Sequence, residues 1–121
     1  IQFHILLSNS CRYIHADENL MSQVMLNLVK NAIEAVETVK KKEISIHVHM
    51  NETGRTCLTV EDTGKGIAEP DLENIFIPFF TTKENGNGIG LNLSKQIMNL
   101  HGGNISIRSR ENQGTMVMLV L

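Results

Sequence analysis

Two asparagines one helical turn apart are the first residues in this chain whose type and spacing suggest chemistry. Asn27 and Asn31 stand within QVMLNLVKNAIEA at residues 23–35, where apolar residues recur at helical spacing. Both fall on a narrow polar stripe, although Lys or Glu would favour a helix more than Asn does. The stripe is either a solvated helix face or a pair of carboxamides presented to a ligand, and a hydrated metal ion with phosphates is one candidate.

A carboxylate followed by two glycines is the second feature. Asp62 ends an apolar stretch, and Gly64 and Gly66 follow it in DTGKGI. A carboxylate at a strand end accepts a hydrogen bond from an exocyclic amine. Glycines two and four residues later let a flat ligand lie close to the backbone and permit positive φ. The alternative interpretation is an ordinary turn after a strand.

A glycine-rich segment before a helical stretch is the third feature. Gly86, Gly88 and Gly90 run into LNLSKQIMNL, and a glycine-rich loop at a helix N-terminus favours phosphate. The spacing matches neither the P-loop nor the dinucleotide fingerprint. Lys83 either brings a positive charge to a terminal phosphate or is a solvated loop lysine.

These three features together predict a nucleotide site, in which the helix supplies metal ligands, the carboxylate reads the base and the glycines contact phosphates. Phe79 and Phe80 lie in the long irregular stretch that ends at the last glycine. A stretch of this length in a small domain is usually functional or mobile. The two aromatic residues form a hinge or docking patch, or they anchor the stretch in the core. We expect one of them to be an anchor.

The elements that must position these residues follow from periodicity and turn signals. We expect Asp17 to be the N-cap of the helix that carries the asparagines, and Gly102 and Gly103 to end the last helix. Turns at residues 51–54 and at 112–114 join two hairpins. We expect strands at 3–7 (an edge strand), 44–50, 56–61, 104–108 and 115–121, a second short extended piece at 12–16, and helices at 17 to about 40, 70–75 and 91–100.

Composition limits the class of protein. The chain has 121 residues and is 41% hydrophobic, which suits a single domain over residues 1–121 with one core. Its net charge of −2 argues against a nucleic-acid partner, and no apolar run approaches the roughly 20 residues that span a bilayer. Cys11 and Cys57 stand far apart, which favours a reducing, cytoplasmic compartment. Because the chain begins at Ile1 rather than Met, we interpret it as part of a longer protein, and we expect the fragment to be monomeric.

The histidines suggest little chemistry. His47 and His49 share one face of a predicted strand, and a solvated face explains them better than a metal site because no third ligand has suitable spacing.

The chain resembles the catalytic, ATP-binding domain of bacterial two-component sensor histidine kinases, within the superfamily that includes gyrase, Hsp90-type chaperones and mismatch-repair ATPases. The resemblance covers nearly the whole chain, including its closing strands. It is carried by four sequence boxes in the family's order: NLVKNAIEA at 27–35, EDTGKGI at 61–67, IFIPFFTTK at 75–83 and GNGIGLNLSKQI at 86–97.

The resemblance implies a two-layer α/β (α+β) sandwich of the Bergerat type, with a mixed sheet of about five strands and about three helices on one face. It implies ATP and Mg²⁺ as cofactors, with Asn31 as the metal ligand. It implies catalytic roles for Asn27, which supports metal and attacking group, and for Lys83. It implies that the nucleotide is bound by Asn27, Asn31, Asp62, Gly64, Gly66, Ile67, Lys83, Gly86, Gly88, Gly90, Leu91 and Thr115.

The resemblance also implies partners. The family's phospho-accepting histidine and its helical hairpin are absent here, so we expect the γ-phosphoryl group to pass to a histidine on a separate dimerisation domain, and from there to a response regulator. Two alternatives remain open. A clamp-type ATPase of the same superfamily would place a glutamate general base where this chain has Asn27. A nucleotide-sensing or docking module would bind ATP without transferring phosphate.

Overall fold

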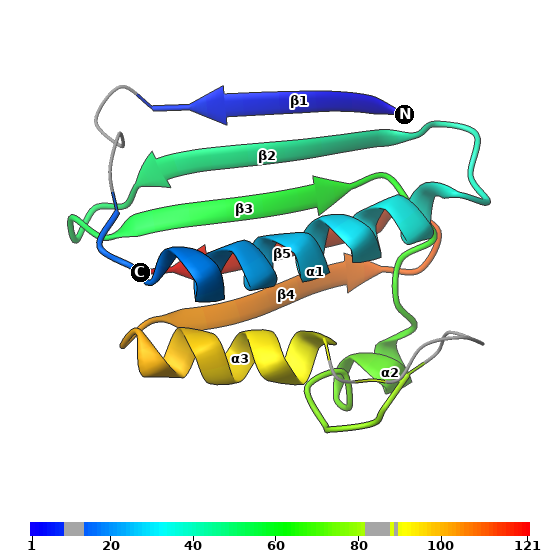
Figure 1. Cartoon of the computed structure of the whole chain (residues 1–121). Coiled ribbons are helices and arrows are strands. Elements are labelled where there is room, and N and C mark those ends of the chain that lie inside the picture. The colour runs from blue at the N-terminus through cyan, green and yellow to red at the C-terminus, as the bar shows by residue number, and fades with distance from the viewer. Residues whose placement is uncertain (9–13, 82–87, 89) are drawn as a thin grey trace.

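The chain folds into a five-stranded mixed sheet with helices packed against it, as a computed structural model shows for residues 1–8, 14–81, 88 and 90–121 (Figure 1). The elements in chain order are β1 (Gln2–Leu7), α1 (Glu18–Val36), β2 (Glu43–Met50), β3 (Thr56–Asp62), α2 (Glu69–Leu72), α3 (Gly90–Leu100), β4 (Asn104–Arg110) and β5 (Gly114–Val120). The two-layer α/β sandwich expected from the sequence is confirmed.

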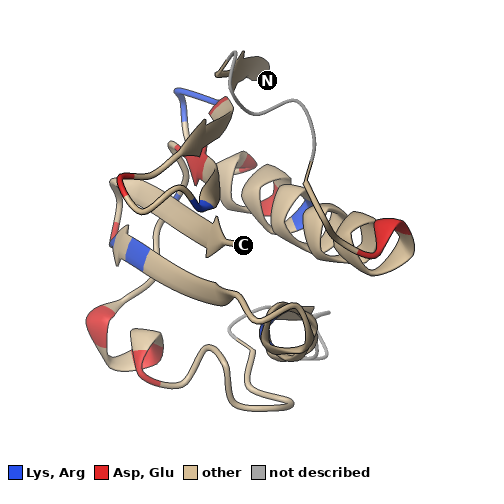
Figure 2. Cartoon of the chain, turned by 90° about the vertical axis from the view of Figure 1, so that its left-hand side faces the viewer, with Lys and Arg blue, Asp and Glu red and all other residues tan. Residues whose placement is uncertain are grey.

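The sheet has the strand order β1-β2-β3-β5-β4. β1 stands at the end of this order and is therefore the edge strand that the sequence predicted. It pairs in parallel with β2, and every other pair is antiparallel. α1 lies over the middle of the sheet and α3 lies over β4, while the short α2 contacts β4 (Figure 1). Viewed along the sheet, α1 and α3 lie on the same side of it (Figure 2).

One core joins the helices to the sheet. Apolar residues at helical spacing on α1 meet alternate residues of β2, β3 and β5, because side chains on a strand point to one face at every second position. The buried cluster consists of Met21, Val24, Leu28, Ala32, Val36, Ile44, Leu58, Val60, Ile97, Met98, Ile105, Val117 and Leu119. This packing fixes the rotation of α1, and its polar stripe therefore faces sideways, toward α3.

The boundaries of α1 are set differently at its two ends. Asp17 is the N-cap, and its side chain accepts a hydrogen bond of 2.9 Å from the backbone N–H of Leu20. The helix ends at Val36, so the predicted end near Lys40 is wrong. The carbonyl oxygen of Ala35 accepts a hydrogen bond from the backbone N–H of Lys65, at 3.0 Å, which replaces a bond that a longer helix would make.

The segment before α1 also differs from expectation. Residues 14–16 do not form a strand, and the rest of the predicted extended piece at 12–16 lies outside the described residues. The hairpin turns at 51–54 and at 112–114 are both present. No helix among the described residues has the length and apolar character needed to cross a membrane.

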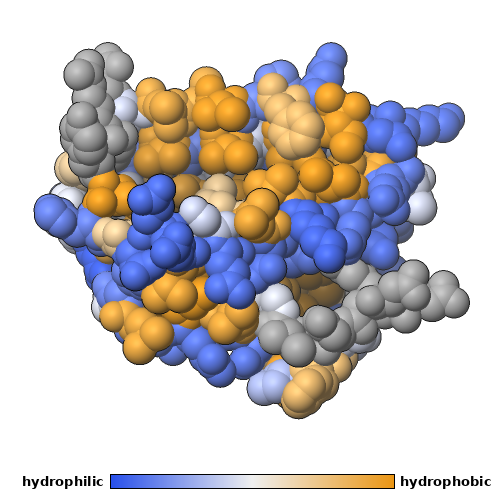
Figure 3. Space-filling view, in the orientation of Figure 1, coloured by the Kyte–Doolittle hydropathy of each residue, from blue (hydrophilic) through white to orange (hydrophobic). Residues whose placement is uncertain are grey.

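β1 leaves apolar side chains in solvent. Phe3, Ile5 and Leu7 are 51%, 65% and 66% exposed. They are in register with Ile44, Ile46 and Val48 of β2, which face the core, so they extend the helix-side face of the sheet beyond α1. This apolar area is visible above α1 in Figure 3.

Candidate functional site

A cavity of about 760 Å³ opens between the polar side of α1, the ends of β3 and β5, and the first turn of α3. Asn31 of α1 and Asp62 of β3 both line it, although 31 residue positions separate them in sequence. The cavity combines carboxamides, carboxylates and glycines with an apolar floor, which is the usual character of a small-molecule site. Its lining also includes residues that the sequence did not single out as binding residues: Leu28, Lys30, Ala32, Glu34, Ala35, Glu37, Val60, Lys65, Ile75, Phe80, Thr81, Leu93, Ile107 and Val117.

Most of the predicted site residues meet at this cavity. Those that line it are Asn27, Asn31, Asp62, Gly66, Ile67, Gly88, Gly90, Leu91 and Thr115. Gly64 is buried and does not line it. Lys83 and Gly86 lie outside the described residues. Phe80 lines the cavity, whereas Phe79 is 76% exposed, which fits the expectation that only one of the two aromatic residues is an anchor.

Asp62 is held at the end of β3, and the residue is only 8% exposed. Burial raises the pKa of this carboxyl group above its ordinary value, and backbone hydrogen bonds from Gly64 and Thr115 act in the opposite direction. The Gly64 N–H donates to Asp62 Oδ1 at 2.8 Å. The side chain is therefore oriented by the Gly64 N–H of its own loop and by the Thr115 N–H of β5, and the Gly64 N–H leaves the second oxygen unoccupied.

Thr115 stands next to Asp62 in the register of β3 and β5, and Ser109 of β4 stands next to Thr115. Ser109 Oγ accepts from the Ile67 N–H at 2.8 Å and lies 2.9 Å from the Gly114 carbonyl oxygen and 2.8 Å from Thr115 Oγ1. All three contacts are hydrogen bonds if the Ser109 hydroxyl donates to the Gly114 carbonyl oxygen and accepts from both the Ile67 N–H and the Thr115 hydroxyl. In this arrangement Thr115 Oγ1 keeps its lone pairs as acceptors.

Ser109 makes hydrogen bonds at this site, but the sequence analysis did not identify it. Its hydrogen bond from the Ile67 N–H connects the loop after β3 to β4. No local sequence pattern predicts this contact. A serine at alternate spacing on a strand otherwise resembles any solvent-facing position.

The glycines after Asp62 have a packing role in addition to the one expected from the sequence. A Cβ atom on Gly64 would lie 2.5 Å from the carbonyl carbon of Ala35. A Cβ atom on Gly66, whose φ is +69°, would lie 2.0 Å from the carbonyl oxygen of Arg110. The missing side chains therefore let the loop fit between the end of α1 and the β4–β5 turn, a packing requirement that the sequence analysis did not foresee. Positive φ at Gly66 was expected and is present.

Asn27 reaches across to α3. Its Nδ2 donates to the carbonyl oxygen of Gly90 at 3.4 Å, and the hydroxyl of Ser94 donates to the same oxygen at 2.8 Å. Ser94 is fully buried, so this contact satisfies its hydroxyl group. The first turn of α3 is therefore anchored to the asparagine-bearing face of α1.

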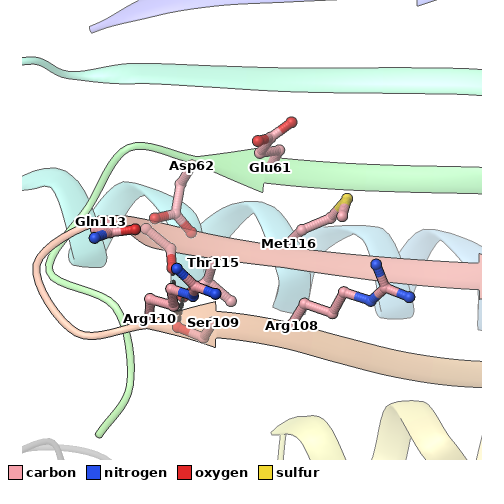
Figure 4. Close-up of a pocket in the computed structure, with 9 residues that line it drawn as sticks. Glu61, Asp62, Arg108, Ser109, Arg110, Gln113, Thr115 and Met116 are labelled. Atoms are coloured by element: carbon pink, nitrogen blue, oxygen red, sulfur yellow. Dashed lines mark hydrogen bonds between the residues drawn. The ribbon is translucent and has the colours of Figure 1, made fainter.

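A second, smaller cavity of about 200 Å³ lies on the open face of the sheet, behind the first. Asp62 and Thr115 line both cavities, and Figure 4 shows these two residues next to one another on neighbouring strands. The other residues that line it are Glu61, Arg108, Ser109, Arg110, Gln113, Gly114 and Met116.

His47 and His49 lie next to one another on β2. The rings of His47 and His49 stack with their centroids 4.7 Å apart. Within the described ranges, no group of three or more His, Cys, Asp or Glu side chains is placed to hold a metal ion. Lys and Arg are interspersed with Asp and Glu along the described ribbon (Figure 2), in line with the absence of a basic patch in the sequence.

Comparison with known proteins identifies the family. Residues 16–121 match the profile of the histidine kinase-, DNA gyrase B- and HSP90-like ATPases. The sensor histidine kinase ZraS of Salmonella typhimurium is 40% identical over 121 residues, which are all of this chain and 26% of that protein. The chain thus spans about a quarter of the length of this relative.

Solved structures agree. The nucleotide-free catalytic domain of histidine kinase ThkA is 36% identical with a TM-score of 0.83, and the match covers 99% of this chain and 77% of that one. Full-length ShkA in complex with AMPPNP is 26% identical with a TM-score of 0.85, covering 98% of this chain and 25% of that one. The chain therefore belongs to the histidine kinase-, gyrase- and HSP90-like ATPase family and is an ATP-binding catalytic domain of the sensor histidine kinase type.

Proposed function

We propose that this domain binds Mg·ATP in the 760 Å³ cavity and donates the γ-phosphoryl group to a histidine on a separate dimerisation domain. The observation that carries the proposal is that Asn31 and Asp62 line one cavity together with Gly88 and Gly90. A carboxylate suited to an amine and a carboxamide suited to a hydrated cation are thus present in a single site. The ShkA structure with AMPPNP supports an adenine nucleotide as its occupant.

The adenine end of the site is assigned to β3 and β5. The Asp62 oxygen that does not accept from Gly64 takes a hydrogen bond from the exocyclic amine of the base. Thr115 Oγ1, which keeps its acceptor lone pairs, lies beside it. Gly66 and Ile67 line the same end, where the apolar floor receives the flat ring.

The metal end is assigned to α1. The side-chain oxygen of Asn31 is a hard oxygen donor of the kind that Mg²⁺ prefers, and Mg²⁺ commonly keeps waters and uses few protein ligands together with substrate phosphates. The donor set therefore fits this ion. When bound, Mg²⁺ neutralises charge on the phosphate oxygens. Asn27, one turn earlier, lines the same cavity and is assigned to supporting the metal and the attacking group.

Catalysis in such a site is mostly positioning and charge neutralisation. The histidine nitrogen of the partner forms a bond to the γ-phosphorus, the bond from that phosphorus to the bridging oxygen breaks, and ADP leaves. Gly86, Gly88, Gly90 and Leu91 are assigned to phosphate contacts, and Lys83 to charge on the terminal phosphate. The phosphoryl group then passes to a response regulator. We place the domain in the cytoplasm, as ATP-dependent signalling requires.

The decisive experiment mixes the domain with dimerisation domains from histidine kinases related to ZraS, in the presence of Mg²⁺ and γ-labelled ATP. We expect acid-labile, base-stable label on the dimerisation domain, as phosphohistidine requires. Release of inorganic phosphate by the domain alone would instead favour a clamp-type ATPase. ATP binding without label on any dimerisation domain would favour a nucleotide-sensing module.

Replacing Asn31 by Ala tests the metal assignment. The variant should bind ATP with an affinity that no longer responds to Mg²⁺, because the protein ligand to the bridging ion is gone. Isothermal titration with and without Mg²⁺ measures this directly. Ser22→Ala, an exposed position on the same helix, serves as the control and should keep the magnesium dependence. A normal magnesium response in the Asn31 variant contradicts the assignment.

A further inference from the structure

Phe79 has an unfavourable backbone conformation and an exposed side chain. Its φ is +68°, a region that L-residues with a bulky side chain rarely occupy, and the residue is 76% exposed. Burial of the ring does not compensate for the free-energy cost of this conformation, because the ring is exposed. Costs of this kind persist where the surrounding structure holds the residue in place, and they often mark functional segments.

The segment that carries Phe79 is attached to α3 at two points on one residue, Phe76. The side-chain Nδ2 of Asn92 donates to the Phe76 carbonyl oxygen at 2.9 Å. The ammonium nitrogen of Lys95 lies 5.0 Å from the centroid of the Phe76 ring, within cation–π range. Gln96 supports the first contact, because its Nε2 donates to Asn92 Oδ1 at 3.1 Å and so fixes the orientation of that amide. We call Asn92 and Lys95 the Phe76 clasp.

The same segment also lines the cavity and contacts Gly88. The backbone N–H of Phe79 donates to the carbonyl oxygen of Gly88 at 3.1 Å. A Cβ atom on Gly88 would lie 2.3 Å from the carbonyl carbon of Phe79, so the two backbones are in close contact. Phe80 lines the cavity on the other side of Phe79. The exposed ring of Phe79 is thus flanked by residues that line the nucleotide cavity.

We propose that Asn92 and Lys95 are positioning residues that couple the position of segment 76–80 to that of α3. A nucleotide bound in the cavity then changes the position and surroundings of the exposed Phe79 ring. α3 begins at the cavity, since Gly90 and Leu91 line it, and the clasp joins the first and second turns of this helix to Phe76. This inference rests on nucleotide binding as proposed above. In this inference, Asn92 and Lys95, which do not line the cavity, transmit a structural change from the phosphate end of the cavity to Phe79 on the surface.

The chain contains no Trp, so Phe79→Trp creates a single fluorescent reporter at this position. In this reporter protein, saturating Mg·ATP should shift the Trp emission. In the same protein with Asn92→Ala and Lys95→Met added, the shift should fall by about half or more, while the Kd for Mg·ATP by calorimetry changes less than about threefold. Two controls are expected to retain the shift: Lys95→Arg, which preserves a cation over the ring, and Asn99→Ala, an exposed change on the same helix.

Several outcomes overturn the inference without touching the proposed function. Calorimetric binding of Mg·ATP with no emission change in the reporter protein removes the coupling. A full shift in the clasp double variant removes the role of Asn92 and Lys95. Should the double variant lose its circular dichroism signal, Lys95→Met alone, at an exposed position, provides the measurement, and a full shift there refutes the lysine's part. Failure of the reporter and of the unmodified chain to bind Mg·ATP refutes the proposed function instead.

Discussion

Replacing Asp62 by Asn should weaken the binding of Mg·ATP by roughly 100-fold, since leaving buried hydrogen-bonding groups unpaired costs about 1–3 kcal/mol each. In the native chain one carboxylate oxygen accepts from the Gly64 N–H at 2.8 Å, and the other is assigned to the amine of adenine. In the variant, the amide oxygen continues to accept from Gly64. The amide NH₂ group then stands where the second oxygen was and opposes the amine of the base, donor against donor.

The fold should survive this change, because the loop contact to Gly64 is retained and a buried charge is removed. Circular dichroism and calorimetry together separate the two effects. Glu61→Gln is the matched control: it removes the same charge from the preceding residue, which is exposed on the open face of the sheet, and should bind Mg·ATP normally. An Asp62 variant that binds as tightly as the native chain would contradict the assignment of the adenine end.

Replacing Gly66 by Ala should lower the free energy of unfolding by about 3 kcal/mol or more, through backbone strain and a clash with a backbone atom. The added Cβ would meet the carbonyl oxygen of Arg110 at 2.0 Å, and that oxygen belongs to a paired strand that cannot rotate away. Gly66 also has φ +69°, which disfavours alanine independently. Urea denaturation followed by circular dichroism measures the loss.

A matched control separates strain from crowding. Gly102 has nearly the same φ, +68°, but no atom within 4 Å of its ideal Cβ position. Gly102→Ala should therefore show only the conformational cost of the left-handed region, about 1 kcal/mol. Equal losses in the two variants would show that the contact with Arg110 does not constrain the loop.

The fold could be predicted from the sequence where local signals and tertiary contacts agree. The apolar periodicity of α1, the Asp17 cap and the two glycines after α3 each specify an element through nearby residues. The end of α1 could not be predicted in the same way. It depends on the Ala35 carbonyl oxygen accepting from Lys65, a residue 30 positions later, which is a contact between segments distant in sequence.

The candidate site shows the same division. The types and order of Asn27, Asn31 and Asp62 were sufficient to place them at one cavity. The cause of the glycines at 64 and 66 was not accessible, because a glycine needed for packing and a glycine needed for a ligand have the same appearance in a sequence. Ser109 escaped notice for a related reason, since its hydrogen bond to Ile67 crosses 42 positions of sequence.

The tight fit of the loop after β3 has a consequence for ligand design. Three backbone contacts hold it: Gly64 against Ala35, Gly66 against Arg110, and the 2.6 Å hydrogen bond from the Asn112 N–H to the Lys65 carbonyl oxygen. A small heterocycle that binds at this end therefore finds a preorganised loop, and its binding loses little entropy through ordering of the protein. Fragment compounds that copy only the donor edge of a purine are therefore the natural starting point for inhibitors, before any phosphate mimic is added.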